Sequence, residues 1–107
     1  MIYSSKYFVP NGYSALTIFP FVFLKHKFLK GDKILINHEH IHLKQQLELL
    51  ILPFFVWYGL EFLFRLAAYK KWNLAYKNIS FEREAYQNDS NLKYLNSRSF
   101  WSFVKYI

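Results

Sequence analysis

The sequence predicts a mainly helical α+β domain, and three observations carry this prediction. Of two long segments in the middle of the chain, the first has apolar residues at helical spacing and the second is apolar almost throughout, as a buried or membrane helix is. One segment near the N-terminus is rich in the β-branched and aromatic residues that strands prefer. Only 3 glycines and 3 prolines interrupt 107 residues, of which 53% are hydrophobic. A chain of this length suits one domain, so residues 1–107 are expected to fold as a single unit.

The N-terminal part contains the predicted strand. Residues 1–13 hold the breaker cluster PNG and are expected to form turns. Ser14–Leu24 has the composition of a strand, but Pro20 has no amide hydrogen to donate to a neighbouring strand. The segment is therefore predicted as a short edge strand, or a small sheet, that is interrupted or ends near Pro20.

A basic connector, Lys25–Lys30, leads to the first predicted helix. A glycine stop is followed by Asp32 as N-cap, because its carboxylate can accept the free amides of a first turn. Apolar residues then recur at three- and four-residue spacings over about Lys33–Leu52. Pro53 is expected to break or kink the helix there.

The second predicted helix, about Phe54–Ala68, is apolar almost all round. It contains most of the uncharged run Leu49–Leu60, which extends to Phe64 if Glu61 is tolerated. The run falls short of the roughly 20 residues that a spanning helix needs. Two interpretations stay open: a core helix buried in protein, and a helix that is embedded in a membrane or lies at its surface, giving membrane association through Leu49–Phe64.

The rest of the chain predicts one further helix and a weak amphipathic end. Lys70–Asn78 is polar and basic, and Ser80 is predicted as the N-cap of a third helix that carries Glu82 and Glu84. The last stretch, Phe100–Ile107, is weakly amphipathic.

Charge and composition exclude several classes of protein. The balance of 14 basic and 7 acidic residues gives a net charge of +7, which is compatible with an anionic neighbour. The lysines are scattered and no nucleic-acid-binding motif is present, so no specific nucleic-acid partner is predicted. Without cysteine, disulfide scaffolds, thiol nucleophiles and sulfur-based zinc sites are excluded. Polar residues at the start predict no cleaved signal peptide, hence a cytoplasmic or membrane-associated protein.

Three of the 4 histidines lie in the motif HEHIH on the first predicted helix. Positions i and i+4 share a helix face, so His38 and His42 present two imidazoles to one point. Glu39 is rotated by about 100° from His38, close enough to reach a water molecule on a metal held there. His40 lies on the other side and is predicted as a supporting or surface residue. The simpler alternative is a polar helix face whose histidines happen to cluster.

A tetrahedral zinc site of this kind needs a third protein ligand. Glu82 and Glu84, in ISFEREAY, are the close acidic pair after the apolar helix. Glu48 is rotated away from His42, and Glu61 is also a poorer candidate. The ordinary interpretation of the pair is a solvated first turn, where carboxylates suit the helix dipole. A set of histidine and carboxylate ligands is compatible with Zn²⁺ and equally with manganese, iron or cobalt.

HEHIH, followed about 40 residues later by a Glu-x-x-Ala helix, resembles the gluzincin zinc metallopeptidases. The nearest comparisons are the minigluzincins and the HExxH domains of the CAAX prenyl protease and ImmA/IrrE families. The resemblance spans roughly residues 16–86 and implies a minimal metallopeptidase-like domain with Zn²⁺ as cofactor and a polypeptide as substrate. It implies His38, His42 and Glu82 as metal ligands, with Glu84 as the alternative ligand, and Glu39 as the catalytic general base.

The resemblance also gives the predicted strand a role, since such peptidases receive an extended peptide along an edge strand, here Leu16–Phe19. Those families often carry Asp or Asn directly after the alanine of Glu-x-x-Ala, where this chain has Tyr86. The hydroxyl that steadies the oxyanion is not assigned among four tyrosines, namely Tyr13, Tyr58, Tyr76 and Tyr86. The alternative to a peptidase is a small membrane-associated protein whose metal site is structural or vestigial.

Overall fold

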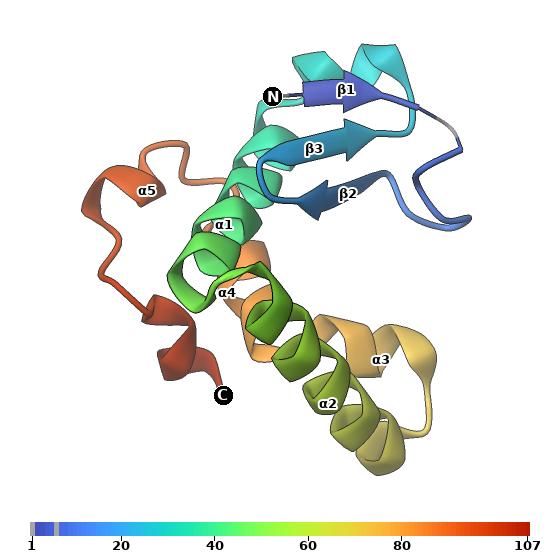
Figure 1. The fold of residues 1–107 in the computed structure, drawn as a ribbon, viewed down its shortest axis with the longest axis vertical. Helices are drawn as coiled ribbons and strands as arrows, with labels where there is room; N and C mark the ends of the chain where they lie inside the picture. The colour runs from blue at the N-terminus through green and yellow to red at the C-terminus, as the bar shows by residue number, and fades with distance from the viewer. Residues whose placement is uncertain (1, 6) are drawn as a thin grey trace.

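The computed structural model describes residues 2–5 and 7–107. Within these residues a small sheet comes first and helices make up most of the rest (Figure 1). The predicted class, mainly helical with strand structure near the N-terminus, is confirmed. Figure 1 shows the sheet towards one end of the molecule and the long helix α2 (Ile51–Tyr69) towards the other, with α1 (Lys33–Leu49) between them.

Three short strands form the sheet, in the order β1-β3-β2. They are β1 (Ile2–Ser4), β2 (Ala15–Ile18) and β3 (Phe21–Leu24). The predicted strand segment is an antiparallel hairpin with Pro20 in its turn, where a missing amide hydrogen interrupts no ladder. Strand β1 pairs in parallel with β3, so the expectation of turns throughout residues 1–13 is wrong for these three residues. A strand this short shows no alternation in the sequence.

Helix α1 begins as predicted. The Asp32 side chain accepts a hydrogen bond from the backbone N–H of Leu35 at 3.1 Å, which confirms it as the N-cap. The basic connector before it contains a short 3-10 helix, η1 (Lys27–Gly31).

The junction between α1 and α2 differs from the prediction. Helix α1 ends at Leu49 and α2 begins at Ile51, so Pro53 lies in the first turn of α2 and does not end α1. Proline is accepted there because the amide hydrogens of a first turn have no partner within the helix. Leu50 makes the turn itself, at a positive φ of 61°. Phe54 is the one buried residue of α2, so the interpretation of this segment as a buried core helix is wrong.

Short helices complete the described chain: α3 (Trp72–Lys77), α4 (Ser80–Asn88), α5 (Tyr94–Ser97) and the 3-10 helix η2 (Ser102–Tyr106). The predicted N-cap role of Ser80 is wrong, because α4 starts at this residue and its side chain caps nothing. Instead the Glu61 carboxylate on α2 accepts hydrogen bonds from the Ser80 backbone N–H, at 2.6 Å, and from its hydroxyl group. A carboxylate distant in sequence therefore replaces the local cap.

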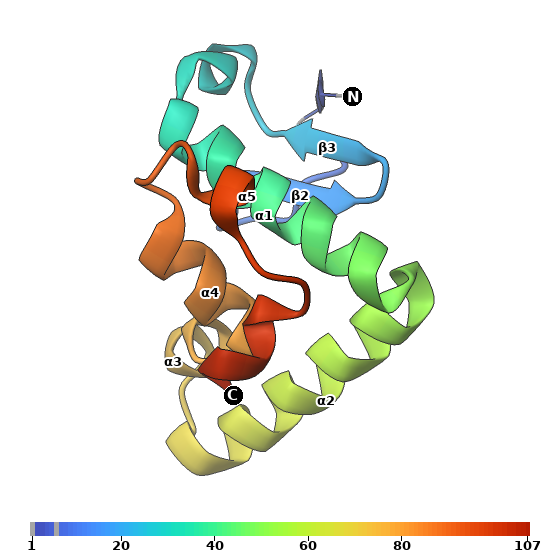
Figure 2. The same cartoon turned by 90° about the vertical axis from the view of Figure 1, so that its left-hand side faces the viewer.

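One cluster of the hydrophobic core lies where α2, α4 and η2 meet, and its buried members are Phe54, Ile79, Phe81 and Phe103. Burying side chains of this size stabilises a fold by about 1.5–3 kcal/mol each. Helix α1 packs against β2 on one side and against α4 on another (Figure 2). Side chains of α1 therefore lie between strand β2, which precedes α1 in the sequence, and helix α4, which follows it. The candidate site forms between α1 and these two elements.

Candidate metal centre

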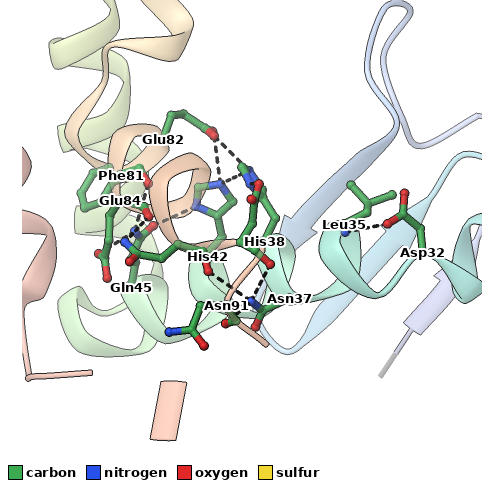
Figure 3. A network of polar contacts seen from close by, with 12 residues as sticks. Asp32, Leu35, Asn37, His38, His42, Gln45, Phe81, Glu82, Glu84 and Asn91 are labelled. Carbon is green, nitrogen blue, oxygen red and sulfur yellow. Dashed lines mark hydrogen bonds and ion pairs between the residues drawn. The ribbon is translucent and has the colours of Figure 1, made fainter. Parts of the chain in front are cut away.

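Two histidines and a glutamate converge between α1 and α4. His38 and His42 project from successive turns of α1, and Glu82 projects from the first turns of α4 (Figure 3). Glu82 Oε1 lies 3.2 Å from His38 Nε2 and 3.1 Å from His42 Nε2, and the two Nε2 atoms are 3.2 Å apart. All three side chains are buried. Three atoms that can bind a metal thus occupy the corners of a nearly equilateral triangle.

The far nitrogen of each imidazole contacts a hydrogen-bond acceptor. His38 Nδ1 lies 3.1 Å from the Asp89 carboxylate, and His42 Nδ1 lies 2.8 Å from Gln45 Oε1. The Gln45 amide cannot be turned round, because its Nε2 donates to the backbone carbonyl of Phe81 and to a Glu84 oxygen. Each neutral imidazole therefore carries its hydrogen on Nδ1, which leaves the Nε2 lone pair free.

This tautomer assignment determines what the three atoms can bind. When both imidazoles are neutral, two Nε2 lone pairs and one carboxylate oxygen face one another at about hydrogen-bond distance with no hydrogen among them. Three acceptors in buried contact repel one another unless a positive charge lies between them. The arrangement therefore attracts a cation, either a proton or a metal ion.

The pKa values of these residues also indicate that a positive charge is favoured between them. Burial alone lowers the pKa of His42, but the Glu82 carboxylate beside it outweighs burial and raises this pKa to about 9. Burial raises the pKa of Glu82, yet the charge of His42 and the hydrogen bonds of both histidines lower it well below its usual range. The second oxygen of Glu82 accepts a hydrogen bond of 2.7 Å from the Tyr58 hydroxyl, which fixes the carboxylate.

The spacing of the three atoms fits a metal ion. Tetrahedral zinc, with bonds of about 2.0–2.1 Å, holds its ligand atoms about 3.3 Å apart. The three distances of 3.1, 3.2 and 3.2 Å are close to that spacing. Imidazole nitrogen and carboxylate oxygen are also ligands that zinc accepts. The same donor set also suits other divalent transition metals.

Glu84 lies elsewhere. It is two positions after Glu82, which turns its side chain by about 200° on a helix. The Glu84 carboxylate accepts hydrogen bonds from Arg98 and, at 2.6 Å, from the Tyr94 hydroxyl. These bonds lower the pKa of Glu84 against the opposing effect of its burial. The structure therefore brings Glu82, and not Glu84, to the histidines.

Glu39 and His40 complete the motif but do not belong to the triangle. The buried Glu39 carboxylate accepts a 2.7 Å hydrogen bond from the Thr17 hydroxyl on β2 and lines two adjoining cavities. His40 is half-buried, burial lowers its pKa, and it lies outside the cluster.

The two cavities flank Glu39. One, of about 540 Å³, reaches His38 and Asp89, and the other, of about 380 Å³, reaches His42 and Glu82. The second is walled mainly by apolar side chains, including Leu16, Phe54, Phe55 and Phe62. All four tyrosines considered from the sequence line at least one of the cavities, namely Tyr13, Tyr58, Tyr76 and Tyr86. Their hydroxyl groups already have partners, since Tyr58 donates to Glu82, Tyr76 and Tyr86 are hydrogen-bonded to each other, and Tyr13 accepts from Trp72.

Strand β2 is an edge strand, but part of its edge is occupied. The Gln46 side chain accepts from the backbone N–H of Phe19 and donates to the carbonyl of Thr17, each at 2.7 Å. A peptide could not use those two groups while Gln46 holds them. The Ala15 end of the strand lines both cavities.

Sequence reasoning missed the residues that support the histidines. Asp89 stands seven positions after Glu82, and Gln45 stands three after His42. Both spacings place side chains on a shared helix face, so a search at helical periods could have found them. Tyr86, at the position where the resembled families often carry Asp or Asn, packs its ring against His38 at 4.5 Å between centroids, and Asp89 supplies the carboxylate instead.

Comparison of the chain with protein families, with curated proteins and with solved structures finds no match.

Proposed function

We propose that this protein is a zinc-dependent metallopeptidase. The observation that carries the proposal is the convergence of three acceptor atoms, from His38, His42 and Glu82, beside a buried glutamate that lines the adjoining cavities. These three residues would hold the ion. A zinc ion in that position supplies Lewis acidity, which lowers the pKa of a water molecule and polarises a carbonyl.

Glu39 takes the role of general base. It follows His38 on α1, and the Thr17 hydroxyl holds one of its oxygens from the strand side. Its carboxylate accepts a proton from the attacking water as the C–O bond forms, and then donates that proton to the amine as the C–N bond breaks. No other described carboxylate outside the triangle lines both cavities.

The substrate is a polypeptide with an apolar residue next to the cleaved bond. The cavity on the His42 and Glu82 side offers mainly apolar walls, which suit a large aliphatic or aromatic side chain. The free Ala15 end of β2 offers backbone groups to an extended chain. Because Gln46 holds the Thr17 and Phe19 groups, this peptide pairs with only a short stretch of the strand.

Metal content is the first test. Protein purified without a His tag and without added metal is expected to contain about one zinc per chain by mass spectrometry. The variants His38→Ala and Glu82→Gln should lose the ion, whereas Glu84→Gln should keep it. Folded wild type that takes up no metal even when zinc is offered would overturn the proposal, and loss of zinc in Glu84→Gln alone would move the third ligand to Glu84.

Peptide hydrolysis is the second test, and it separates a catalytic ion from a structural one. A peptide mixture is incubated with the protein, and new termini are identified by mass spectrometry. Glu39→Gln should keep zinc and lose activity by about 10²–10⁴-fold, the usual contribution of a general base. Chelation followed by zinc should restore the wild type but not this variant. Equal activity in Glu39→Gln would remove Glu39 as the general base, and a zinc-loaded wild type that cleaves nothing would favour a structural site.

A further inference from the structure

Helix α2 has two faces of opposite character. On the inner face Tyr58 donates to Glu82, and Glu61 accepts from Ser80, so polar groups of α2 are bonded to α4. On the outer face Leu52, Val56, Leu60 and Phe64 follow one another at intervals of four residues and form one row. Their exposed fractions are 74, 55, 64 and 68%. Figures 1 and 2 show that this helix runs along the end of the molecule away from the sheet.

The length of the exposed apolar face is unusual for a helix surrounded by water. Ile51–Tyr69 is 19 residues long and is the one described helix apolar enough to cross a membrane by length and composition, yet only 6% of its most apolar window is buried within the protein. Surface hydrophobic residues that form a continuous patch, in contrast to single ones, mark a contact site.

The C-terminal segment, residues 98–107, adjoins this patch. Trp57 on α2 packs edge-on against Phe103 of η2, with ring centroids 5.3 Å apart. Trp101 packs against the same Phe103, with ring centroids 6.1 Å apart, and this segment exposes the apolar side chains of Phe100, Trp101 and Val104. Tryptophan with one apolar body and one polar N–H is a residue that favours the boundary between water and lipid.

The surface charge is more positive than the sequence total of +7 indicates. Six of the 7 acidic residues are at least half-buried and accept internal bonds, namely Glu39, Glu48, Glu61, Glu82, Glu84 and Asp89. Only Asp32 is exposed, against nine exposed lysines among the described residues. Lys70 and Lys71 directly follow α2 and are both exposed. The solvent therefore meets a cationic surface beside an apolar patch.

We infer that this patch, the outer row of α2 with the exposed apolar residues of the C-terminal segment, binds the surface of an anionic lipid bilayer. Apolar side chains enter the boundary between headgroups and acyl chains, while lysines meet the headgroup charge. Helix α2 lies along the surface and does not cross the bilayer, because its inner face holds Tyr58 and Glu61 in hydrogen bonds to α4. A second copy of the chain is a poorer occupant, since two cationic surfaces would repel each other.

Vesicle flotation tests this inference without using the metal site. The wild type should float with vesicles of phosphatidylglycerol and phosphatidylcholine, and at least tenfold less with phosphatidylcholine alone. The variant Leu60→Glu with Phe64→Glu should bind the anionic vesicles at least tenfold more weakly. The matched control, Phe28→Glu with Leu92→Glu, makes the same charge change at two exposed apolar positions outside the patch and should bind as the wild type. Circular dichroism checks that all three proteins are folded.

Three results would contradict the inference. Wild type that does not float with the anionic vesicles rules out lipid as the occupant. Equal loss in the control variant shows that net charge alone governs binding and that the patch has no part in it. A lipid-free wild type that is dimeric by light scattering, with a monomeric Leu60→Glu, Phe64→Glu variant, assigns the patch to a second copy.

Discussion

At the scale of single residues, the direction of two hydrogen bonds decides what the HEHIH motif can bind. Asp89 and Gln45 offer oxygen acceptors to the Nδ1 atoms of His38 and His42. Had either partner been a donor, one Nε2 would carry the hydrogen and could not bind a metal. Asp89 is itself held, because Asn37 on α1 donates to its backbone carbonyl at 2.8 Å. Residues outside the motif thus leave the Nε2 atoms of both histidines free to bind a cation.

Removing the acceptor beside His38 should weaken the metal centre without removing a ligand. Asp89→Ala is expected to lower zinc affinity by about 10–100-fold, the range found for partners that orient metal-binding histidines. Competition with a coloured zinc chelator measures the change. Asp89→Asn keeps an oxygen acceptor and should recover part of the affinity. Unchanged affinity in Asp89→Ala would show that His38 needs no orienting partner.

At the scale of the elements, the turn between α1 and α2 determines where the apolar helix points. Leu50 has φ 61° and ψ 146°, a region that is almost reserved for glycine. Its side chain is 70% exposed, so little packing compensates the strain. Leu50 therefore adopts a strained backbone conformation at the point where the chain turns from α1 into α2.

Glycine at this turn should stabilise the protein. Leu50→Gly relieves a conformation that costs about 1–3 kcal/mol, less the larger chain entropy of glycine, and is expected to raise the free energy of unfolding by about 1 kcal/mol. Urea denaturation measures this change. Leu47→Gly, at a half-exposed position inside α1, is the control and should lower the stability by about 1 kcal/mol. A loss of stability in Leu50→Gly would mean that the side chain contributes more than its exposure indicates.

Among the helices and strands, several features that depend on local sequence were predicted correctly. The cap at Asp32, the apolar spacing of α1 and the i, i+4 histidines are local patterns, and the structure contains all of them. The start of α4 was predicted to within one residue, but its cap was predicted wrongly, because Glu61 from a different helix takes the place of a local cap. The short strand β1 was missed because its partner β3 lies about 20 residues away. Each error arises where backbone groups form hydrogen bonds with a partner that is distant in sequence, because no local pattern predicts such a bond.

For the candidate site the same distinction holds. The histidine pair follows from helical spacing alone, whereas Glu82 and Glu84 could not be separated by spacing from a helix 40 residues away. In the structure the Arg98 guanidinium binds Glu84, whereas Glu82 lies against the two histidines of α1. No pattern in the sequence connects Arg98 with either glutamate, since that pairing exists only when the C-terminal segment is folded against α1 and α4.

At the scale of the whole molecule, one buried ion network joins the C-terminal segment to the candidate metal centre. Arg98 donates to Glu84 on α4 and, at 2.7 Å, to Glu48 on α1, and all three side chains are almost fully buried. Glu84 in turn accepts from Gln45, whose oxygen faces His42. The C-terminal residues therefore support the same α1 and α4 geometry that places His42 and Glu82 together.

Breaking this network should destabilise the whole fold. Arg98→Ala leaves two buried carboxylates without a counter-charge and is expected to lower the free energy of unfolding by about 3–5 kcal/mol. Urea denaturation measures the loss. The triple variant Glu48→Gln, Glu84→Gln, Arg98→Met removes all three charges and should regain at least half of it, because much of the cost comes from the unpaired carboxylates. If the triple variant is as unstable as Arg98→Ala, the packing of the arginine stem, and not its charge, holds the C-terminal segment against α1 and α4.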